Sequence, residues 1–298
     1  MTNEPQSSAC CVLWLLCTYA AAAADATAAV ADITQGGARE LAFAVPVTDG
    51  ARILVRVCRP SGRGPARLVV INHGSPANSA DRPRMKPGRC DLAAAQWFLS
   101  RGYVVAFPLR RGYGATGGNW AENYGSCDGA DYFHAGLETA RDINAAVEAL
   151  TTLPFVSASG VVIVGQSAGG WGTIAYDSVA HPNVAAFLVM AGGRGGHLHE
   201  EPNRNCHPER LVQAAGQFGK TATTPMLWVY TLNDTFFRPE IARALYQSFS
   251  ANGGHAQFEQ PERFDGEGHN LFFGPAGSAI WGPIVERYLA QQSIGALN

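Results

Sequence analysis

The sequence predicts a single α/β domain with a mostly parallel, eight-stranded sheet flanked by helices. Short runs of β-branched apolar residues alternate along the chain with longer stretches of helical periodicity. Neither an internal repeat nor a long linker interrupts this alternation after Ile33. The 298 residues, 47% of them hydrophobic, suffice for one large core. Repeated β–α units of this kind bury a parallel sheet between two layers of helices.

The eight predicted strands are short apolar segments. They comprise residues 41–45, 52–58, 67–72, 103–107, 161–165, 184–190, 226–231 and 257–260. Asp49-Gly50, a favoured turn dipeptide, separates the first two strands and predicts an antiparallel hairpin. Ligands bind parallel sheets at the carboxyl ends of the strands, so candidate functional residues are expected just after each strand.

The predicted helices lie between these strands. They comprise residues 92–100, 132–150, 168–180, 209–218, 239–252 and 278–291. In the second helix, apolar residues recur on one face, as expected of a helix that packs on a sheet. That face consists of Ala140, Ile143, Val147 and Leu150.

Residues 1–26 are predicted to form a secretory signal peptide, and residues 27–298 the folded domain. The apolar run from Val12 to Ala24 is followed by Ala24-Asp25-Ala26, a small-x-small cleavage pattern. The run is shorter than the roughly 20 residues that a membrane span needs. No Lys or Arg precedes it, so a misassigned start or an Ala-rich leader stays an alternative. We expect a secreted or periplasmic protein that begins near Asp25 or Thr27.

Four cysteines lie beyond this leader, and an even number in an exported chain permits disulfides. Cys90 and Cys127 stand in polar or Gly-rich segments, whereas Cys58 stands in an apolar strand. The sequence therefore favours a Cys90–Cys127 bridge. Four free thiols, with Cys206 among them, are the alternative.

The strongest chemical motif is Gly165-Gln166-Ser167-Ala168-Gly169. A five-residue apolar strand precedes this G-x-S-x-G sequence, and a helix of small residues follows it. In this context the serine occupies a sharp turn that projects its hydroxyl into a cleft, and a side chain at either flanking glycine would crowd the backbone. The motif predicts Ser167 as a nucleophile.

A serine nucleophile needs a general base and a carboxylate that orients it. Asp234 follows the strand at 226–231, and His269 stands in the Gly-rich loop after the last strand. Both come after Ser167 in the order that this motif requires. We therefore expect a Ser167–His269–Asp234 triad, with Glu240 and Asp265 as weaker alternatives for the carboxylate.

The tetrahedral intermediate needs hydrogen-bond donors for its oxyanion. The strand at 67–72 runs into Asn72-His73-Gly74-Ser75-Pro76, a loop that could supply one backbone N–H. We expect the backbone N–H groups of Ser75 and Ala168 to be the two oxyanion donors. His73 precedes the serine in sequence and is expected to support the loop instead of acting as the base.

Two further residues are predicted to contact substrate. Tyr113 lies in the Gly-rich loop after the strand at 103–107, and Trp171 lies in the helix after Ser167. Arg110 and Arg111 of the same loop could meet an anionic substrate, but structural ion pairing within the loop is favoured.

Together the HGSP loop, the R-G-Y-G-x-T-G-G loop, GQSAGG, the LND strand end and the GEGHN loop resemble the dienelactone-hydrolase-like branch of the α/β-hydrolase superfamily. They are also similar to acyl-peptidase and cocaine-esterase-type hydrolases. The resemblance runs from about Leu41 to the C-terminus and implies an α/β-hydrolase fold with a short cap at about 192–222. Dienelactone hydrolases carry a cysteine nucleophile where this chain has Ser167, so a general serine esterase is the better interpretation.

A histidine-rich stretch from His197 to His207 falls in the expected cap. H-x-H with a nearby Cys-His can bind zinc, but a polar, substrate-facing loop is the simpler interpretation, and we predict no metal.

The sequence thus predicts an enzyme that cleaves small-molecule carboxylic esters without a cofactor. A peptidase or amidase would use the same residues, and a non-catalytic binding protein on the same scaffold is the third possibility. A formal net charge of -2 without a basic cluster argues against a nucleic-acid partner, and no membrane partner is expected. The oligomeric state is not indicated.

Overall fold

A computed structural model describes Met1 and residues 28–35, 38–47, 50–62 and 64–294 of the chain. Its centre is a nine-stranded sheet in the order β1-β2-β3-β5-β4-β6-β7-β8-β9. The strands are β1 (Ala28–Gln35), β2 (Ala38–Pro46), β3 (Arg52–Arg59), β4 (Leu68–Asn72), β5 (Val104–Leu109), β6 (Val161–Gln166), β7 (Val184–Met190), β8 (Met226–Val229) and β9 (Ala256–Glu259). The mostly parallel α/β architecture is confirmed, and all eight predicted strands are present.

The sheet has an antiparallel part and a parallel part. β1, β2 and β3 pair antiparallel with one another, and β3 also pairs antiparallel with β5. From β5 to β9 all neighbours are parallel, so the carboxyl ends of six strands meet at one edge. The predicted count of eight strands is one too low, because β1 adds an edge strand beside β2.

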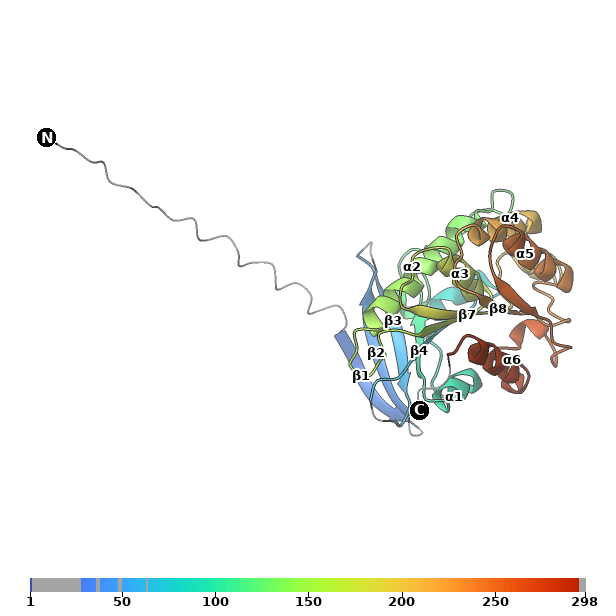
Figure 1. Ribbon diagram of the computed structural model, residues 1–298. Helices are drawn as coiled ribbons and strands as arrows, with labels where there is room; N and C mark the ends of the chain where they lie inside the picture. The colour runs from blue at the N-terminus through green and yellow to red at the C-terminus, as the bar shows by residue number, and fades with distance from the viewer. Residues whose placement is uncertain (2–27, 36–37, 48–49, 63, 295–298) are drawn as a thin grey trace.

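Helices cover both faces of the sheet (Figure 1). One face carries α2 (Tyr132–Leu150), α3 (Ala168–Asp177), α4 (Pro208–Gly219) and α5 (Pro239–Ala251), and the other carries α1 (Ala93–Leu99) and α6 (Gly277–Gln291). Two hydrophobic cores result, one on each side of the sheet. The predicted apolar face of α2 is confirmed, since all four of its residues are buried in the first core.

The six helices agree with the predicted ranges to within three residues at each end. The segment predicted as a short cap contains the 3-10 turn η3 (Leu198–Glu200) and helix α4. Leu211 and Phe218 of α4 belong to the first core. The predicted signal peptide, residues 1–26, lies outside the described residues apart from Met1.

Two disulfides bridge Cys58 to Cys90 and Cys127 to Cys206, with Cα–Cα separations of 5.6 and 5.3 Å. The predicted Cys90–Cys127 bridge is therefore wrong. Cys58 and Cys90 belong to the core beneath α1 and α6, whereas Cys127 and Cys206 belong to the core on the opposite face. The sheet separates Cys90 from Cys127, the pair that the sequence favoured.

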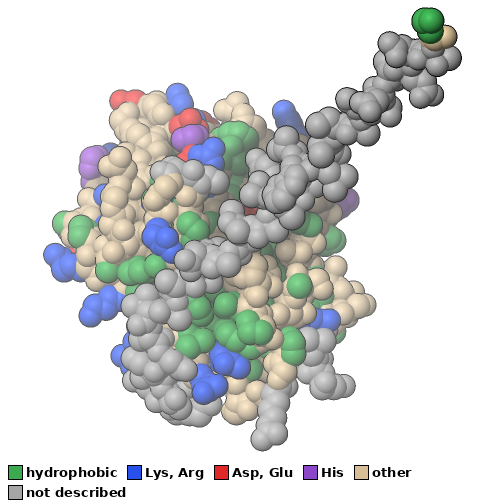
Figure 2. Space-filling view, turned by 90° about the vertical axis from the view of Figure 1, so that its left-hand side faces the viewer, with side chains coloured by type: hydrophobic (Ala, Val, Ile, Leu, Met, Phe, Trp, Pro, Cys, Tyr) green, Lys and Arg blue, Asp and Glu red, His purple; other side chains and the backbone are tan. Residues whose placement is uncertain are grey.

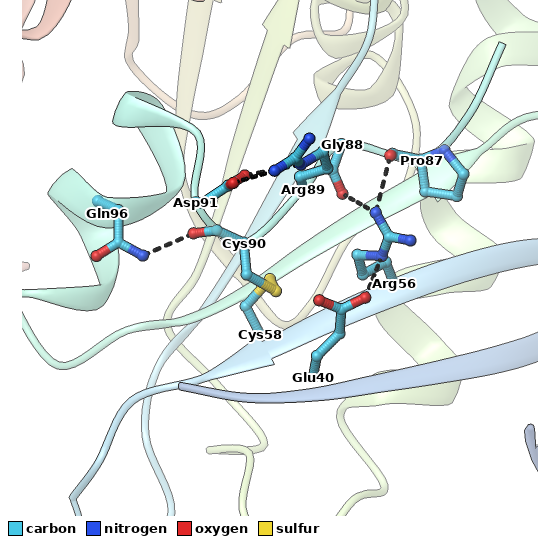
Figure 3. Close-up of a disulfide and its surroundings, with 9 residues drawn as sticks. All are labelled: Glu40, Arg56, Cys58, Pro87, Gly88, Arg89, Cys90, Asp91 and Gln96. Atoms are coloured by element: carbon cyan, nitrogen blue, oxygen red, sulfur yellow. Dashed lines mark hydrogen bonds and ion pairs between the residues drawn. A yellow bond between two sulfur atoms is a disulfide. The ribbon is translucent and has the colours of Figure 1, made fainter. Parts of the chain in front are cut away.

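The Cys58–Cys90 bridge ties the loop before α1 to β3 (Figure 3). Beside it, Arg56 pairs with Glu40 at 2.8 Å and donates to the carbonyls of Pro87 and Gly88 at 3.3 and 3.2 Å. Gln96 of α1 donates to the Cys90 carbonyl at 2.7 Å. The bridge and these bonds fix the loop at 85–92 on the face of the sheet that α1 and α6 cover.

On the face that Figure 2 shows, Lys and Arg side chains stand as separate groups among hydrophobic and uncharged surface. In the described part of the chain, no helix is both long and apolar enough to cross a membrane.

Candidate active site

Ser167 occupies the turn between β6 and α3 in a conformation that favours glycine. Its φ is 55° and its ψ is -120°, and it stands as the residue before the first turn of α3. Its backbone is held by a bond from its N–H to the Met190 carbonyl (3.1 Å) and one from the Gly193 N–H to its carbonyl (3.0 Å). A strained serine in a strand–turn–helix unit is the geometry expected of a nucleophile elbow.

The two glycines of the motif are required by close packing, as predicted. A Cβ at Gly165 would lie 2.2 Å from the Gly169 carbonyl oxygen, and one at Gly169 would lie 2.4 Å from the Asn72 carbonyl oxygen. Such contacts are far inside van der Waals range. The turn can therefore form only with glycine at both positions.

Asp234 and His269, which are 35 residues apart, meet at the carboxyl edge of the sheet. Nδ1 of His269 lies 3.1 Å from Oδ2 of Asp234, and both side chains are buried. The other carboxylate oxygen accepts the backbone N–H groups of Phe236 and Phe237, each at 2.8 Å. Because a carboxylate only accepts, Nδ1 of His269 carries a proton, so Nε2 is the nitrogen that has the lone pair in the neutral ring.

Asp234 is the carboxylate that orients His269 in this structure. The alternatives, Glu240 and Asp265, are exposed, and Glu240 lies beside Arg238 instead.

The turn at Ser167 and the loop of His269 are joined by the neighbouring glutamine. Nε2 of Gln166 donates to the His269 carbonyl at 3.1 Å. Within the described residues, no hydrogen bond joins the Ser167 hydroxyl directly to His269. Catalytic hydrogen bonds are often long before substrate binds and shorten in the Michaelis complex.

An aromatic stack covers the His269 ring. Phe236 lies parallel to it at a centroid distance of 4.2 Å, and His197 stacks on the other side of Phe236 at 3.4 Å. His197 also bonds the Thr235 hydroxyl at 2.8 Å, and burial lowers its pKa. The stack shields one side of the imidazole from water.

The candidate oxyanion donors are unused by the protein. In the part of the chain that the structure describes, the backbone N–H groups of Ser75 and Ala168 have no acceptor. Ala168 is the first residue of α3, where the helix dipole also favours negative charge. The Ser75 loop is close to Ser167, because a Cβ at Gly74 would lie 2.9 Å from the Ser167 Cβ.

His73 supports this loop, as expected, and is not placed to act as a base. Its Nδ1 lies 2.8 Å from the Gly74 carbonyl, and its Nε2 accepts the Arg110 N–H at 3.4 Å. Burial, and secondarily the Arg110 charge, lowers the pKa of His73 to about 3. The ring is neutral at physiological pH, with both nitrogens occupied.

The two arginines after β5 form structural ion pairs, as favoured. Arg110 pairs with Glu122 at 2.8 Å, and Arg111 pairs with Glu138 at 3.0 Å and Asp142 at 2.6 Å. The partners of Arg111 lie on α2 and not within its own loop, which the sequence did not indicate.

The two predicted substrate contacts are wrong for this structure. Tyr113 and Trp171 are both fully buried, so neither presents a surface to a ligand. Trp171 donates its indole N–H to the Tyr132 carbonyl at 2.7 Å and packs on Phe218 in the core. Although Trp171 is close to Ser167 in sequence, it faces inward because α3 is buried on all sides.

The histidine-rich stretch does not gather into a ligand set. Among the described residues, no group of three or more His, Cys, Asp or Glu side chains could hold a metal ion. His207 instead pairs with Glu209 at 2.5 Å.

Glu267, which no sequence pattern singled out, joins the loops after β8 and β9. Its carboxylate accepts the backbone N–H groups of Thr235 and His269, each at 3.0 Å, and the Thr235 hydroxyl. Burial would raise the pKa of Glu267, but these hydrogen bonds outweigh it and lower the pKa. The available signal was an acidic residue two positions before the candidate catalytic histidine, and such a residue is also common in ordinary turns.

Known structures place the chain in one class of fold. It is similar to a Pyrococcus furiosus esterase, Pf2001, with 13% identity over 85% of this chain and 92% of that one, and a TM-score of 0.59. An acetyl xylan esterase from Paenibacillus sp. R4 gives 16% identity, 89% and 87% coverage and a TM-score of 0.61. An acylaminoacyl peptidase from Pyrococcus horikoshii gives 16% identity and a TM-score of 0.61, over 87% of this chain but 42% of the peptidase. The chain has the α/β-hydrolase fold.

Sequence comparison adds a narrower likeness. Residues 90–192 match the prolyl oligopeptidase family. No curated protein sequence matches the chain. The comparisons do not single out the dienelactone-hydrolase-like branch, so that subtype stays a prediction.

Proposed function

We propose that the protein is a serine hydrolase that cleaves carboxylic esters through an acyl-serine intermediate. The observation that carries the proposal is the Asp234–His269 pair, which leaves Nε2 of His269 free as a base at the edge where the strained Ser167 turn lies. The α/β-hydrolase fold and the esterases among its structural relatives support it.

In the proposed mechanism, His269 Nε2 removes the proton from the Ser167 hydroxyl as its oxygen attacks the ester carbonyl carbon. The Ser75 and Ala168 amides stabilise the resulting oxyanion. The tetrahedral intermediate collapses as His269 returns the proton to the departing alcohol. Water, deprotonated by His269, then hydrolyses the acyl-serine by the same steps in reverse. The residues need no cofactor for this chemistry.

A peptidase is the second candidate, because residues 90–192 match the prolyl oligopeptidase family. The same residues would cleave an amide, with an amine as the leaving group. The chain spans 42% of the similar acylaminoacyl peptidase, and its coverage of the two esterases is 92% and 87%. We take the ester as the first candidate because most of each esterase chain has a counterpart here.

Fluorophosphonate labelling with mass-spectrometric mapping tests the proposal. We expect one adduct on Ser167 in the wild type and none in Ser167→Ala, whose circular dichroism should match the wild type. Rates on short p-nitrophenyl esters and on aminoacyl anilides then separate the two substrates. An unlabelled wild type, or equal labelling of both chains, would show that the protein is no serine hydrolase, and faster anilide cleavage would make it a peptidase.

We also propose that the protein is exported. The apolar segment from Val12 to Ala24 and the two disulfides support this location. N-terminal sequencing of the protein from the medium or periplasm should begin near Asp25 or Thr27. A full-length chain found only in the cytoplasm would contradict export.

A further inference from the structure

A buried polar cluster lies behind the loop of residues 73–76. It comprises Arg110, Tyr113, Glu122, Thr139 and Arg194, each at most 4% exposed, and we call it the Glu122 cluster. The mechanism proposed above uses none of these side chains. Burying three charges is costly unless each is paired, so their position beside the candidate oxyanion loop calls for a physical explanation.

Glu122 is the common acceptor of the cluster. Its carboxylate accepts from Nε of Arg110 at 2.8 Å and from the Tyr113 hydroxyl, and it forms an ion pair with Nη2 of Arg194 at 2.9 Å. Burial alone would raise the pKa of Glu122, but the two guanidinium groups outweigh it and hold that pKa well below its usual range. Glu122 is therefore ionised and can only accept hydrogen bonds.

This charge fixes the direction of the next hydrogen bond. The Tyr113 hydroxyl has one proton, and it is donated to Glu122. Oη of Tyr113 lies 2.5 Å from Oγ of Ser75, so Ser75 must be the donor of that bond. The Ser75 hydroxyl proton thus points at Tyr113, and the backbone N–H is the donor that Ser75 keeps for a ligand.

A second tether holds the other side of the same loop. Nη1 of Arg110 donates to the His73 carbonyl at 2.9 Å, and the Arg110 backbone N–H donates to the His73 ring at 3.4 Å. Residues 73 and 75 are therefore both bound to the segment 110–113. Gly74 between them lies against Ser167.

We propose that Tyr113, Glu122 and Arg110 are positioning residues that aim the Ser75 backbone N–H at the oxyanion. The inference rests on the proposed function, since it assigns Ser75 a donor role in that reaction. Two arginines and one glutamate also leave one positive charge in excess behind the loop, which favours the developing negative charge.

Tyr113→Phe tests the proposal, because it removes the hydroxyl but keeps the ring that packs edge-on against His73. Because the Ser75 amide would no longer be held in position, we expect kcat on a p-nitrophenyl ester to fall about 10- to 100-fold. KM should change less than about threefold. The rate of fluorophosphonate labelling should fall in parallel. Ser75→Ala removes the other end of the same bond without altering the core and should show the same loss. The double variant should be no worse than either single variant.

Tyr176→Phe is the matched control. Tyr176 is a buried tyrosine like Tyr113, and its hydroxyl donates to Oδ1 of Asn144 at 2.8 Å, away from the cluster. This variant should keep the wild-type kcat even if its melting temperature falls. Three outcomes would overturn the positioning role while the wild type still hydrolyses ester. They are a wild-type kcat in Ser75→Ala, a change in KM without a change in kcat, and additive losses of kcat in the double variant. A wild type that neither labels nor hydrolyses ester would instead refute the proposed function, and this inference with it.

Discussion

Ser167 holds a backbone conformation that costs free energy in any residue but glycine. A φ of 55° with a ψ of -120° is sparsely populated for side chains with a Cβ, and each such residue costs about 1–3 kcal/mol. The bonds to Met190 and Gly193 keep the serine there. The strain is explained if the hydroxyl has to project from the turn.

Replacing this serine separates strain from chemistry. The free energy of unfolding of Ser167→Gly should exceed that of Ser167→Ala by about 1 kcal/mol, because glycine adopts a positive φ without penalty. Both variants should lose ester hydrolysis. Equilibrium urea unfolding measures the difference, and equal stabilities would argue against a strained turn.

The proton position on His269 follows from Asp234. In Asp234→Asn, the amide oxygen can still accept from Phe236 and Phe237, which turns the NH₂ group toward Nδ1. Nδ1 must then accept, the proton moves to Nε2, and the base is lost. We expect kcat to fall about 10⁴-fold with the fold intact.

Glu240→Gln is the control for this variant, since Glu240 is the exposed alternative carboxylate. It should retain wild-type kcat. If Glu240→Gln lost activity while Asp234→Asn kept it, Glu240 and not Asp234 would be the carboxylate that orients His269.

Chain order and strand ends sufficed to predict that Asp234 and His269 meet at the carboxyl edge of the sheet. Asp234 and His269 follow strands of one parallel sheet, and parallel strands bring their carboxyl ends to one edge. The direction of a side chain was less predictable. Cys58, Trp171 and Tyr113 were misjudged because local sequence does not tell which neighbour lies above or below a buried strand or helix.

Among the elements, the loops after β8 and β9 carry Asp234 and His269, and Glu267 fastens one loop to the other. Glu267→Gln should lower the free energy of unfolding at pH 7 by about 1 kcal/mol, a small loss because the group is only partly buried. The folded-state pKa is depressed, so this contribution is complete above the unfolded pKa and disappears as the pH falls through the folded value. The two chains should therefore become equally stable in acid.

Urea unfolding between pH 7 and pH 3 measures this convergence. Glu262→Gln, an exposed substitution that precedes the same loop, provides the control and should match the wild type throughout. A constant difference between Glu267→Gln and the wild type at every pH would show that the carboxylate charge is not the cause.

The regular elements were predictable wherever apolar periodicity was strong. β1 was missed because its sequence, AAVADITQ, is rich in alanine and contains aspartate, both poor strand formers. It also directly follows the predicted leader. Backbone pairing with β2, which no local pattern reveals, defines this strand.

Over the whole molecule, the two disulfides stabilise different layers. Cys58–Cys90 fastens the loop before α1 to β3, and Cys127–Cys206 lies in the core on the other side of the sheet. Replacing either pair by alanine should lower the free energy of unfolding by about 2–4 kcal/mol. Because the bridges lie in separate cores, the two losses should add to within about 0.5 kcal/mol in the quadruple variant. Urea unfolding of the three variants checks this, and a strongly non-additive result would mean that the two cores are coupled.

The convergence of Ser167, His269 and the two backbone amides is tested most directly by a crystal structure of the fluorophosphonate adduct. We predict phosphorus bonded to Oγ of Ser167, with the phosphoryl oxygen about 3 Å from the backbone nitrogens of Ser75 and Ala168. Nε2 of His269 should lie within hydrogen-bond distance of the adduct. An adduct on another residue, or a phosphoryl oxygen turned away from both amides, would contradict this account.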